Sequence, residues 1–340
     1  MLALAARRAA RGARALATQT VFSPARKLAQ RERAAARPDA ADFDYVRAEV
    51  AARLVERLGD ITRSFGDVLD LGAGTGATLH ALLAARAGGG GGGDDARGPR
   101  SVRAVTLLDP SARVLSRDAA AQDAAAAAAG VSVSRRAAPL DGAALPFADA
   151  SFDLVLSSMA LHWVNDVPGL LAEARRVLRP DGAFMAAFVG GETLQELRAA
   201  AVAAEHERDG GVSPRVSPMM GASDAGNLLA GAGFGLPTVD VDTFTLEYPT
   251  AAALFEHLRA AGESGAALGA RAGARRDTLL ATAAAYTAAH GDADGAVPAT
   301  VQVIFMIGWA PAASQPRAKA RGSVPKGFSE RKTALPPSSL

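Results

Sequence analysis

The chain has 340 residues, of which 49% are apolar and 21% are charged, and it contains no cysteine. This composition excludes disorder over the whole chain, and the absence of cysteine excludes disulfides, thiolate metal sites and clusters held by cysteine. The 37 basic and 35 acidic residues nearly cancel, and the basic residues gather toward both ends, so the body of the chain offers no field for nucleic acid.

Both ends of the chain are predicted to lie outside the folded domain. Residues 1–30 are rich in arginine and alanine and contain no acid before Glu32. This pattern predicts a mitochondrial presequence and basic arm, the alternative being an arm without a targeting role. Residues 313–340 are rich in proline, serine and basic residues, and are predicted to form a disordered basic tail. No window approaches the roughly 18 apolar residues of a membrane span, so any membrane contact is expected to be peripheral.

Strands and helices are predicted to alternate through the first half of the domain. The predicted strands are 67–71, 102–109, 131–134, 152–157, 183–189, 238–248 and 301–309. The predicted helices are 43–58, 77–85, 111–129, 167–178, 193–207, 224–232, 250–261 and 276–289. This order predicts a doubly wound α/β domain over residues 31–312, with a mostly parallel seven-stranded sheet and helical insertions at 190–235 and 249–298.

A glycine-rich turn follows the first predicted strand, in the segment Leu69-Asp70-Leu71-Gly72-Ala73-Gly74-Thr75-Gly76. Glycines permit a sharp turn there and let a ligand lie against the main chain. Gly72, Gly74 and Ala77 also satisfy the pattern of dinucleotide-binding turns. The turn alone therefore leaves the type of nucleotide ligand open.

Three acids narrow that choice. Asp70 lies two residues before Gly72, Asp109 ends the second predicted strand, and Asp141 precedes the segment 145–147. All three are expected at the carboxyl ends of the strands, where open α/β sheets bind ligands. Three carboxylates would repel two phosphates but suit a nucleoside that carries an amine and a sulfonium.

These features together resemble the class I S-adenosylmethionine-dependent methyltransferases. The resemblance covers the glycine turn, Asp109, Asp141, Leu145-Pro146-Phe147, Phe152-Asp153-Leu154-Val155 and Leu178-Arg179-Pro180-Asp181-Gly182. It implies that the cofactor is S-adenosylmethionine. It also implies that Asp70, Gly72, Ala73, Gly74 and Gly76 hold the methionine part, that Asp109 holds the ribose, and that Asp141 and Gly142 hold the adenine.

A narrower resemblance runs from about Val21 to Trp309 and is to a family of mitochondrial assembly factors for respiratory complex I. It rests on Phe43-Asp44-Tyr45, Leu161-His162-Trp163-Val164-Asn165-Asp166, Gly190-Gly191-Glu192-Thr193-Leu194, Gly262-Glu263-Ser264 and Val297-Pro298-Ala299-Thr300. The family has a methyltransferase fold but is assigned arginine hydroxylation on an iron–sulfur subunit of complex I. The resemblance implies that subunit as partner, other assembly factors as further partners, and a location on the matrix side of the inner membrane. The malonyl-carrier-protein methyltransferases of biotin synthesis are more distantly similar.

The catalytic residue stays unknown, with His162, Trp163 and Glu192 as candidates. His162 could orient a substrate or move a proton, and Trp163 could stack on a guanidinium, or both could be packing residues. Glu192 could pair with an arginine, but a carboxylate at the start of a helix is the simpler interpretation. No metal site is predicted from the five histidines.

Two other functions remain open on the sequence. One is a methyltransferase acting on a small molecule or a carrier protein, and the other is a non-catalytic assembly chaperone that keeps the cofactor pocket for stability.

Overall fold

The computed structural model describes residues 20–87, 97–269 and 273–316. The predicted presequence up to residue 19, most of a glycine-rich segment at 88–96, and the tail from residue 317 lie outside the described residues. The predicted boundary between residues 30 and 31 falls inside a helix, α2 (Pro24–Ala35), which packs on the domain.

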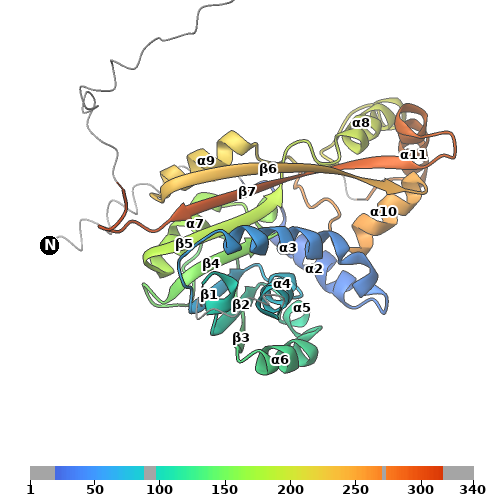
Figure 1. Cartoon of the computed structure of the whole chain (residues 1–340). Coiled ribbons are helices and arrows are strands. Elements are labelled where there is room, and N and C mark those ends of the chain that lie inside the picture. Colours follow the sequence, from blue (N-terminus) through green and yellow to red (C-terminus); the bar gives the residue numbers. More distant parts are fainter. Residues whose placement is uncertain (1–19, 88–96, 270–272, 317–340) are drawn as a thin grey trace, which may run out of the picture.

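The predicted doubly wound fold with a seven-stranded, mostly parallel sheet is confirmed (Figure 1). The strand order is β3-β2-β1-β4-β5-β7-β6, and only β7 runs antiparallel to its neighbours β5 and β6. The strands are β1 (Asp67–Leu71), β2 (Ala104–Asp109), β3 (Ser132–Ala137), β4 (Phe152–Ser158), β5 (Leu178–Val189), β6 (Gly235–Tyr248) and β7 (Val297–Trp309). The order reverses between β2-β1 and β4, so the carboxyl ends of β1 and β4 border the crevice in which such sheets bind ligands.

Helices cover both faces of the sheet, because the central strands are apolar on both sides. One apolar cluster joins the sheet to α3 (Tyr45–Gly59), α4 (Ala77–Ala87) and α6 (Ala119–Ala128). A second cluster joins the other face to η3 (Leu161–Trp163), α7 (Val167–Val177) and α9 (Ala222–Gly231). The short elements η1 (Ala40–Phe43), η2 (Pro99–Ser101) and α5 (Ala112–Ser116) complete this half.

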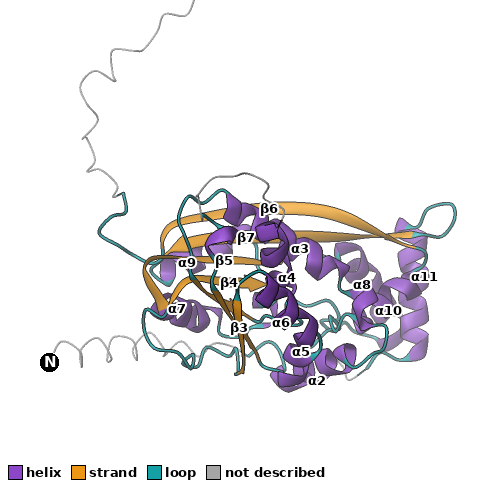
Figure 2. Ribbon diagram, turned by 60° about the horizontal axis from the view of Figure 1, so that its bottom comes forward, coloured by secondary structure: helices purple, strands orange, loops and turns teal. Residues whose placement is uncertain are grey.

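The insertions build a separate lobe at one end of the long strands β6 and β7 (Figure 2). Its helices are α8 (Gln195–Asp209), α10 (Ala251–Ala260) and α11 (Arg276–His290). A third apolar cluster, centred on Tyr248 and Tyr286, holds them to the strand ends. The lobe therefore has its own core, as expected for insertions after the fifth and sixth strands.

Several observed elements differ from the predicted ones, and β7 begins at Val297, four residues before its predicted start. The helix predicted over 111–129 is divided into α5 and α6 at Arg117 and Asp118. The third strand continues three residues beyond its predicted end. The turn predicted at 180–182 lies within β5, where the register with β4 shifts and Asp181 has φ +63°. A bulge absorbs the turn residues without ending the strand.

Candidate functional site

The glycine turn joins β1 to α4 and has the backbone that the sequence predicts. Gly72, Gly74 and Gly76 have φ values of +74°, +59° and +84°, a region that L side chains rarely adopt. A Cβ at Gly72 would overlap the Cβ of Ala160, in the segment after β4. The turn therefore packs directly against Ala160.

Backbone hydrogen bonds fix the turn to the end of β2. The N–H groups of Gly72 and Ala73 both donate to the Leu108 carbonyl, at 2.8 and 3.1 Å. The N–H of Gly74 donates to Asp109 Oδ2 at 3.0 Å. The end of β2 thus places a carboxylate directly at the glycine turn.

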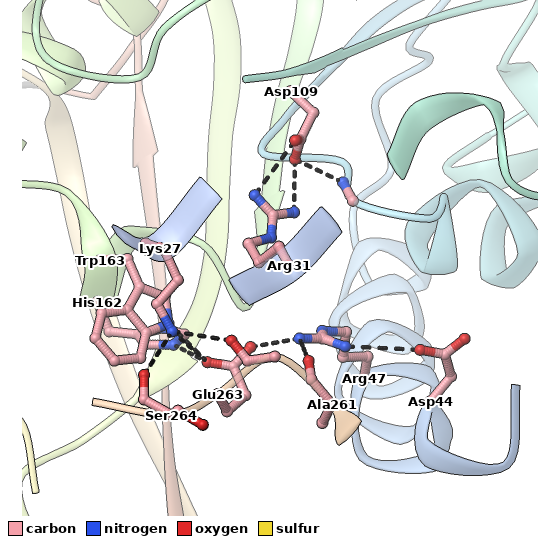
Figure 3. Close-up of polar contacts among 12 residues, drawn as sticks. Lys27, Arg31, Asp44, Arg47, Asp109, His162, Trp163, Ala261, Glu263 and Ser264 are labelled. Atoms are coloured by element: carbon pink, nitrogen blue, oxygen red, sulfur yellow. Dashed lines mark hydrogen bonds and ion pairs between the residues drawn. The ribbon is translucent and has the colours of Figure 1, made fainter. Parts of the chain in front are cut away.

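Asp109 is fully buried, and its carboxylate is saturated by donors. Besides Gly74, the N–H of Ser111 donates to Oδ1 at 3.0 Å. Arg31 of α2 donates to both oxygens, at 3.3 and 2.7 Å. The acid that the resemblance assigns to a ribose is therefore paired with a guanidinium of the same chain (Figure 3).

Asp70 lies on the neighbouring strand β1 and is buried like Asp109, but its carboxylate lacks the donors that Asp109 has. Neither of its oxygens accepts a hydrogen bond of ordinary geometry from a described residue. Burial raises the pKa of Asp70 to about 7; the charge of Asp109 adds to this rise, and the Thr78 hydroxyl opposes it. A cationic group placed beside the turn would favour the ionised form.

Asp141 and Gly142 lie in the loop after β3. Asp141 is exposed and accepts a hydrogen bond from the N–H of Ala143 at 3.0 Å, while Gly142 is buried with φ +80°. In the same loop, Leu140 lies against Gly72. The loop therefore borders the glycine turn, and the assignment of both residues to adenine stays a prediction.

A cavity of about 230 Å³ borders the segment after β4, between the sheet and the insertion lobe. His162 and Trp163 line one side of it, together with Met159. The other walls are mostly apolar and come from α8, β6, β7, α10 and the loop 261–265, through Leu194, Leu197, Leu246, Tyr248, Leu254, Phe255, Leu258, Glu263 and Val301. Beside Gly74 and Thr75 the space is much smaller, about 20 Å³, because Arg31 and Arg47 help to line it.

Glu263 is the centre of a polar cluster at the edge of the cavity (Figure 3). Trp163 Nε1 donates to it at 2.7 Å, Arg47 donates to it as well, and Lys27 Nζ and His162 Nε2 lie 3.7 and 3.6 Å away. Burial alone would raise the pKa of Glu263, but the cations Lys27 and Arg47 hold it well below its usual value. Glu263 is therefore ionised at neutral pH.

His162 is buried, and desolvation lowers its pKa even though Glu263 opposes the change. Its Nδ1 has no hydrogen-bond partner among the described residues. The imidazole is thus neutral near pH 7, with one buried ring nitrogen that has no partner, in a residue that lines the cavity.

Glu192 is not brought together with the other two catalytic candidates. It is exposed, and its backbone N–H donates to Gln302 at 3.4 Å. The following residues Thr193 and Leu194 line the cavity instead. Glu192 itself is not among the residues that line the cavity, and its catalytic role stays a prediction.

Four charged residues of the site were missed from the sequence: Lys27, Arg31, Arg47 and Glu263. Lys27 and Arg31 lay in or beside the segment taken as an arm, although their spacing of four residues is a helical signal. Glu263 lies in the motif Gly262-Glu263-Ser264, which suggests no chemical role for it. Within the described ranges, no group of three or more histidine and acidic side chains is arranged to hold a metal ion.

Comparisons with known proteins agree with the fold. A family model described as a methyltransferase domain matches residues 69–186. The zebrafish (Danio rerio) protein named arginine-hydroxylase NDUFAF5, mitochondrial, is 38% identical over 310 residues, which span 91% of this chain and 89% of the relative. A malonyl-[acyl-carrier protein] O-methyltransferase of Methylovorus sp. (strain MP688) is 34% identical over 298 residues, 88% of this chain and 90% of that protein.

A solved structure from Bacillus halodurans, provisionally described as a methyltransferase, superposes with a TM-score of 0.51. It is 17% identical and covers 78% of this chain and all of its own. At this identity the likeness concerns the fold alone.

Proposed function

This chain belongs to the family of the mitochondrial arginine-hydroxylase NDUFAF5, and from that premise we propose that it binds S-adenosylmethionine and acts on a protein arginine in mitochondria. The observation that carries the proposal is the shared wall between two sites. Ala160 touches the glycine turn at Gly72, and its neighbours Met159, His162 and Trp163 line the cavity. A ligand bound at the turn and a substrate side chain bound in the cavity would therefore both contact the segment 159–163.

The residues at the turn fit this cofactor chemically. The buried carboxylate of Asp70 has no hydrogen-bonding donor of ordinary geometry, which suits the cationic end of the methionine part. Gly72, Gly74 and Gly76 keep the turn free of side chains, and Asp109 presents the carboxylate that ribose hydroxyls require. S-adenosylmethionine supplies a sulfonium cation with an activated methyl group. The protein supplies the acids and the close backbone.

The cavity fits an arginine side chain. Its apolar walls suit the aliphatic stem, while the ring of Trp163 and the carboxylate of Glu263 suit a guanidinium. His162, neutral and with a free nitrogen, can accept a hydrogen bond from that group and orient it.

We also propose the partner and the place within mitochondria. The partner is an iron–sulfur subunit of respiratory complex I, met on the matrix side of the inner membrane, with other assembly factors as further partners. No described helix is long and apolar enough to cross a bilayer. Membrane contact in this proposal is peripheral.

Mass spectrometry of the complex I iron–sulfur subunits tests the proposal. Cells that lack this protein are complemented with the wild type, with Asp109→Asn, or with Asp240→Asn as a matched control on an exposed strand. We expect one arginine to gain one oxygen with the wild type and the control and to stay unmodified with Asp109→Asn. An identical pattern with and without the protein would refute arginine hydroxylation.

A second function is favoured by the likeness to the malonyl-[acyl-carrier protein] O-methyltransferase. In that case the acceptor gains a methyl group and the cavity takes an acyl chain. The experiment separates the two when the acyl-carrier protein of the same cells is analysed as well, since a methyl and an oxygen differ in mass.

A further inference from the structure

Lys27 occupies a cage built for a cation. Its Nζ lies 3.2 Å from the centroid of the Trp163 ring, and donates to the carbonyls of Gly262 and Ser264 at 3.0 and 3.1 Å. The Glu263 carboxylate lies 3.7 Å away. An aromatic face, a carboxylate and two carbonyls are all electron-rich, so the cage selects positive charge.

Arg31, one helical turn later on the same face of α2, occupies the second site. Its guanidinium pairs with both oxygens of Asp109, and its Nη2 lies 3.4 Å from where a Cβ on Gly74 would stand. The guanidinium therefore covers both the ribose-binding acid and the glycine turn (Figure 3). Cofactor hydroxyls cannot reach Asp109 while Arg31 is there.

The attachment of α2 to the domain is polar. Among the described residues, none of its side chains belongs to any of the three apolar clusters, and the only buried ones are Lys27 and Ala34. Gln30 donates to the Gly265 carbonyl and Ser23 caps the first turn. The apolar anchor lies just before the helix, where buried Phe22 packs edge-on against Trp163, so α2 itself is held mainly by hydrogen bonds and ion pairs. An element with few buried apolar side chains is among the first to open locally.

We propose that α2 is a self-ligand of the active site, in which Arg31 stands in for the cofactor ribose and Lys27 for the guanidinium of the substrate. Because both cations belong to one helix, a ligand that displaces one also withdraws the other. The two ligands therefore bind with positive coupling. This inference rests on the proposed function, and adds to it the two residues that couple cofactor binding to substrate binding.

The charges around Glu263 favour such an exchange. Lys27 and Arg47 place two basic groups beside this carboxylate, although Arg47 also pairs with Asp44 at 3.6 Å. A substrate guanidinium would add a third basic group unless Lys27 leaves. Burial lowers the pKa of Lys27 to about 7, against the attraction of Glu263, so this position holds the ammonium only weakly near neutral pH.

Binding measurements on the full chain test the proposal. The probes are S-adenosylhomocysteine for the cofactor site and acetyl-arginine amide for the cage. In the wild type we expect saturating S-adenosylhomocysteine to strengthen binding of acetyl-arginine amide at least about fivefold, the lower range of allosteric coupling. In Arg31→Gln we expect tighter S-adenosylhomocysteine binding and a coupling factor near one. Arg31→Lys, which keeps one charge, should fall between.

Hydrogen exchange supplies a readout of the helix itself. Amides of residues 24–35 should exchange faster when S-adenosylhomocysteine binds the wild type, and should exchange fast without it in Arg31→Gln. The matched control is Arg33→Gln, on an exposed position of the same helix, which should behave as the wild type.

Four results would overturn the inference. Weaker S-adenosylhomocysteine binding in Arg31→Gln would make Arg31 a cofactor ligand. Slower exchange of α2 on binding would make the helix a closing lid, and undiminished coupling in Arg31→Gln would place the coupling elsewhere. Absence of S-adenosylhomocysteine binding by the folded wild type would refute the proposed function, and with it this inference.

Discussion

Two regions of the molecule gather charges from distant segments, and they differ in burial more than in distance. In the inner region, Arg31 pairs with Asp109 at 2.7 Å, and that aspartate side chain is 0% exposed. In the outer region, on α3 and β6, Arg57 pairs with Asp240 at 2.6 Å, and that aspartate is 58% exposed. The pairs look alike in a list of contacts, yet water solvates only the second.

Distance alone therefore does not determine how much each ion pair contributes to stability. A pair in water gains little, because solvent screens it and its side chains lose freedom. A buried pair has been desolvated, so removing one partner leaves the other charge without compensation. We therefore expect substitutions of similar chemistry to have large effects in the inner region and small ones in the outer region.

The largest effect is expected at Asp70, the inner acid without a pair. Its folded-state pKa is raised to about 7, whereas an unfolded aspartate loses its proton near pH 4. The folded state thus holds the proton longer, and stability falls as pH rises from 4 to 7. Asp70→Asn should remove this loss, gaining on the order of 4 kcal/mol at pH 8 and almost nothing at pH 4.

Urea denaturation of the ligand-free protein at both pH values measures this gain. Asp123→Asn, on the exposed side of α6, is the control and should show no such pH dependence. An equal change at pH 4 and pH 8 would contradict the assignment to ionisation.

Glu263 should give the next largest effect, in the opposite direction. Glu263→Gln keeps the shape but leaves Lys27 and Arg47 without their carboxylate, so we expect a loss of about 3 kcal/mol. Adding Lys27→Met should recover part of that loss, because one unpaired cation is then gone. A single variant as stable as the wild type would show that solvent already compensates these charges.

Asp109→Asn should cost less, about 2 kcal/mol, because the amide oxygen can still accept some of the four hydrogen bonds. The effect should be non-additive with Arg31→Gln, since the two side chains interact directly. A double-mutant cycle in urea measures this coupling. Strict additivity would mean that the guanidinium and the carboxylate do not stabilise each other.

The sequence was informative where chemistry follows local pattern. Apolar runs and glycines located β1 and the turn at Gly72, and the end of β2 located Asp109, because each signal lies within a few residues. Topology then brings strand ends together, so His162 and Trp163 could be placed near the turn without knowing any contact.

The self-ligand helix could not be predicted in the same way. Arg31 meets a residue 78 positions away, and Lys27 meets carbonyls more than 230 positions away. Such polar contacts produce no hydrophobic periodicity in the sequence. The side chains by which α2 contacts the domain are mainly charged or polar, and its exposed and buried residues are alike in composition. The sequence alone does not assign Glu192 either, since a helix start favours a carboxylate whether or not it faces the site.

The smallest effect is expected in the outer region, and it completes the comparison. Asp240 accepts from Arg57, but Asp242 accepts from the same guanidinium at 3.0 Å, and Arg57 also lies 3.7 Å above the ring of Phe305. Asp240→Asn therefore removes one screened interaction while the arginine keeps its other contacts. We expect a change below about 0.5 kcal/mol that shrinks further as salt is added. Urea denaturation at low and high ionic strength measures it, and a salt-independent loss as large as that of Asp109→Asn would mean that burial does not separate the two regions.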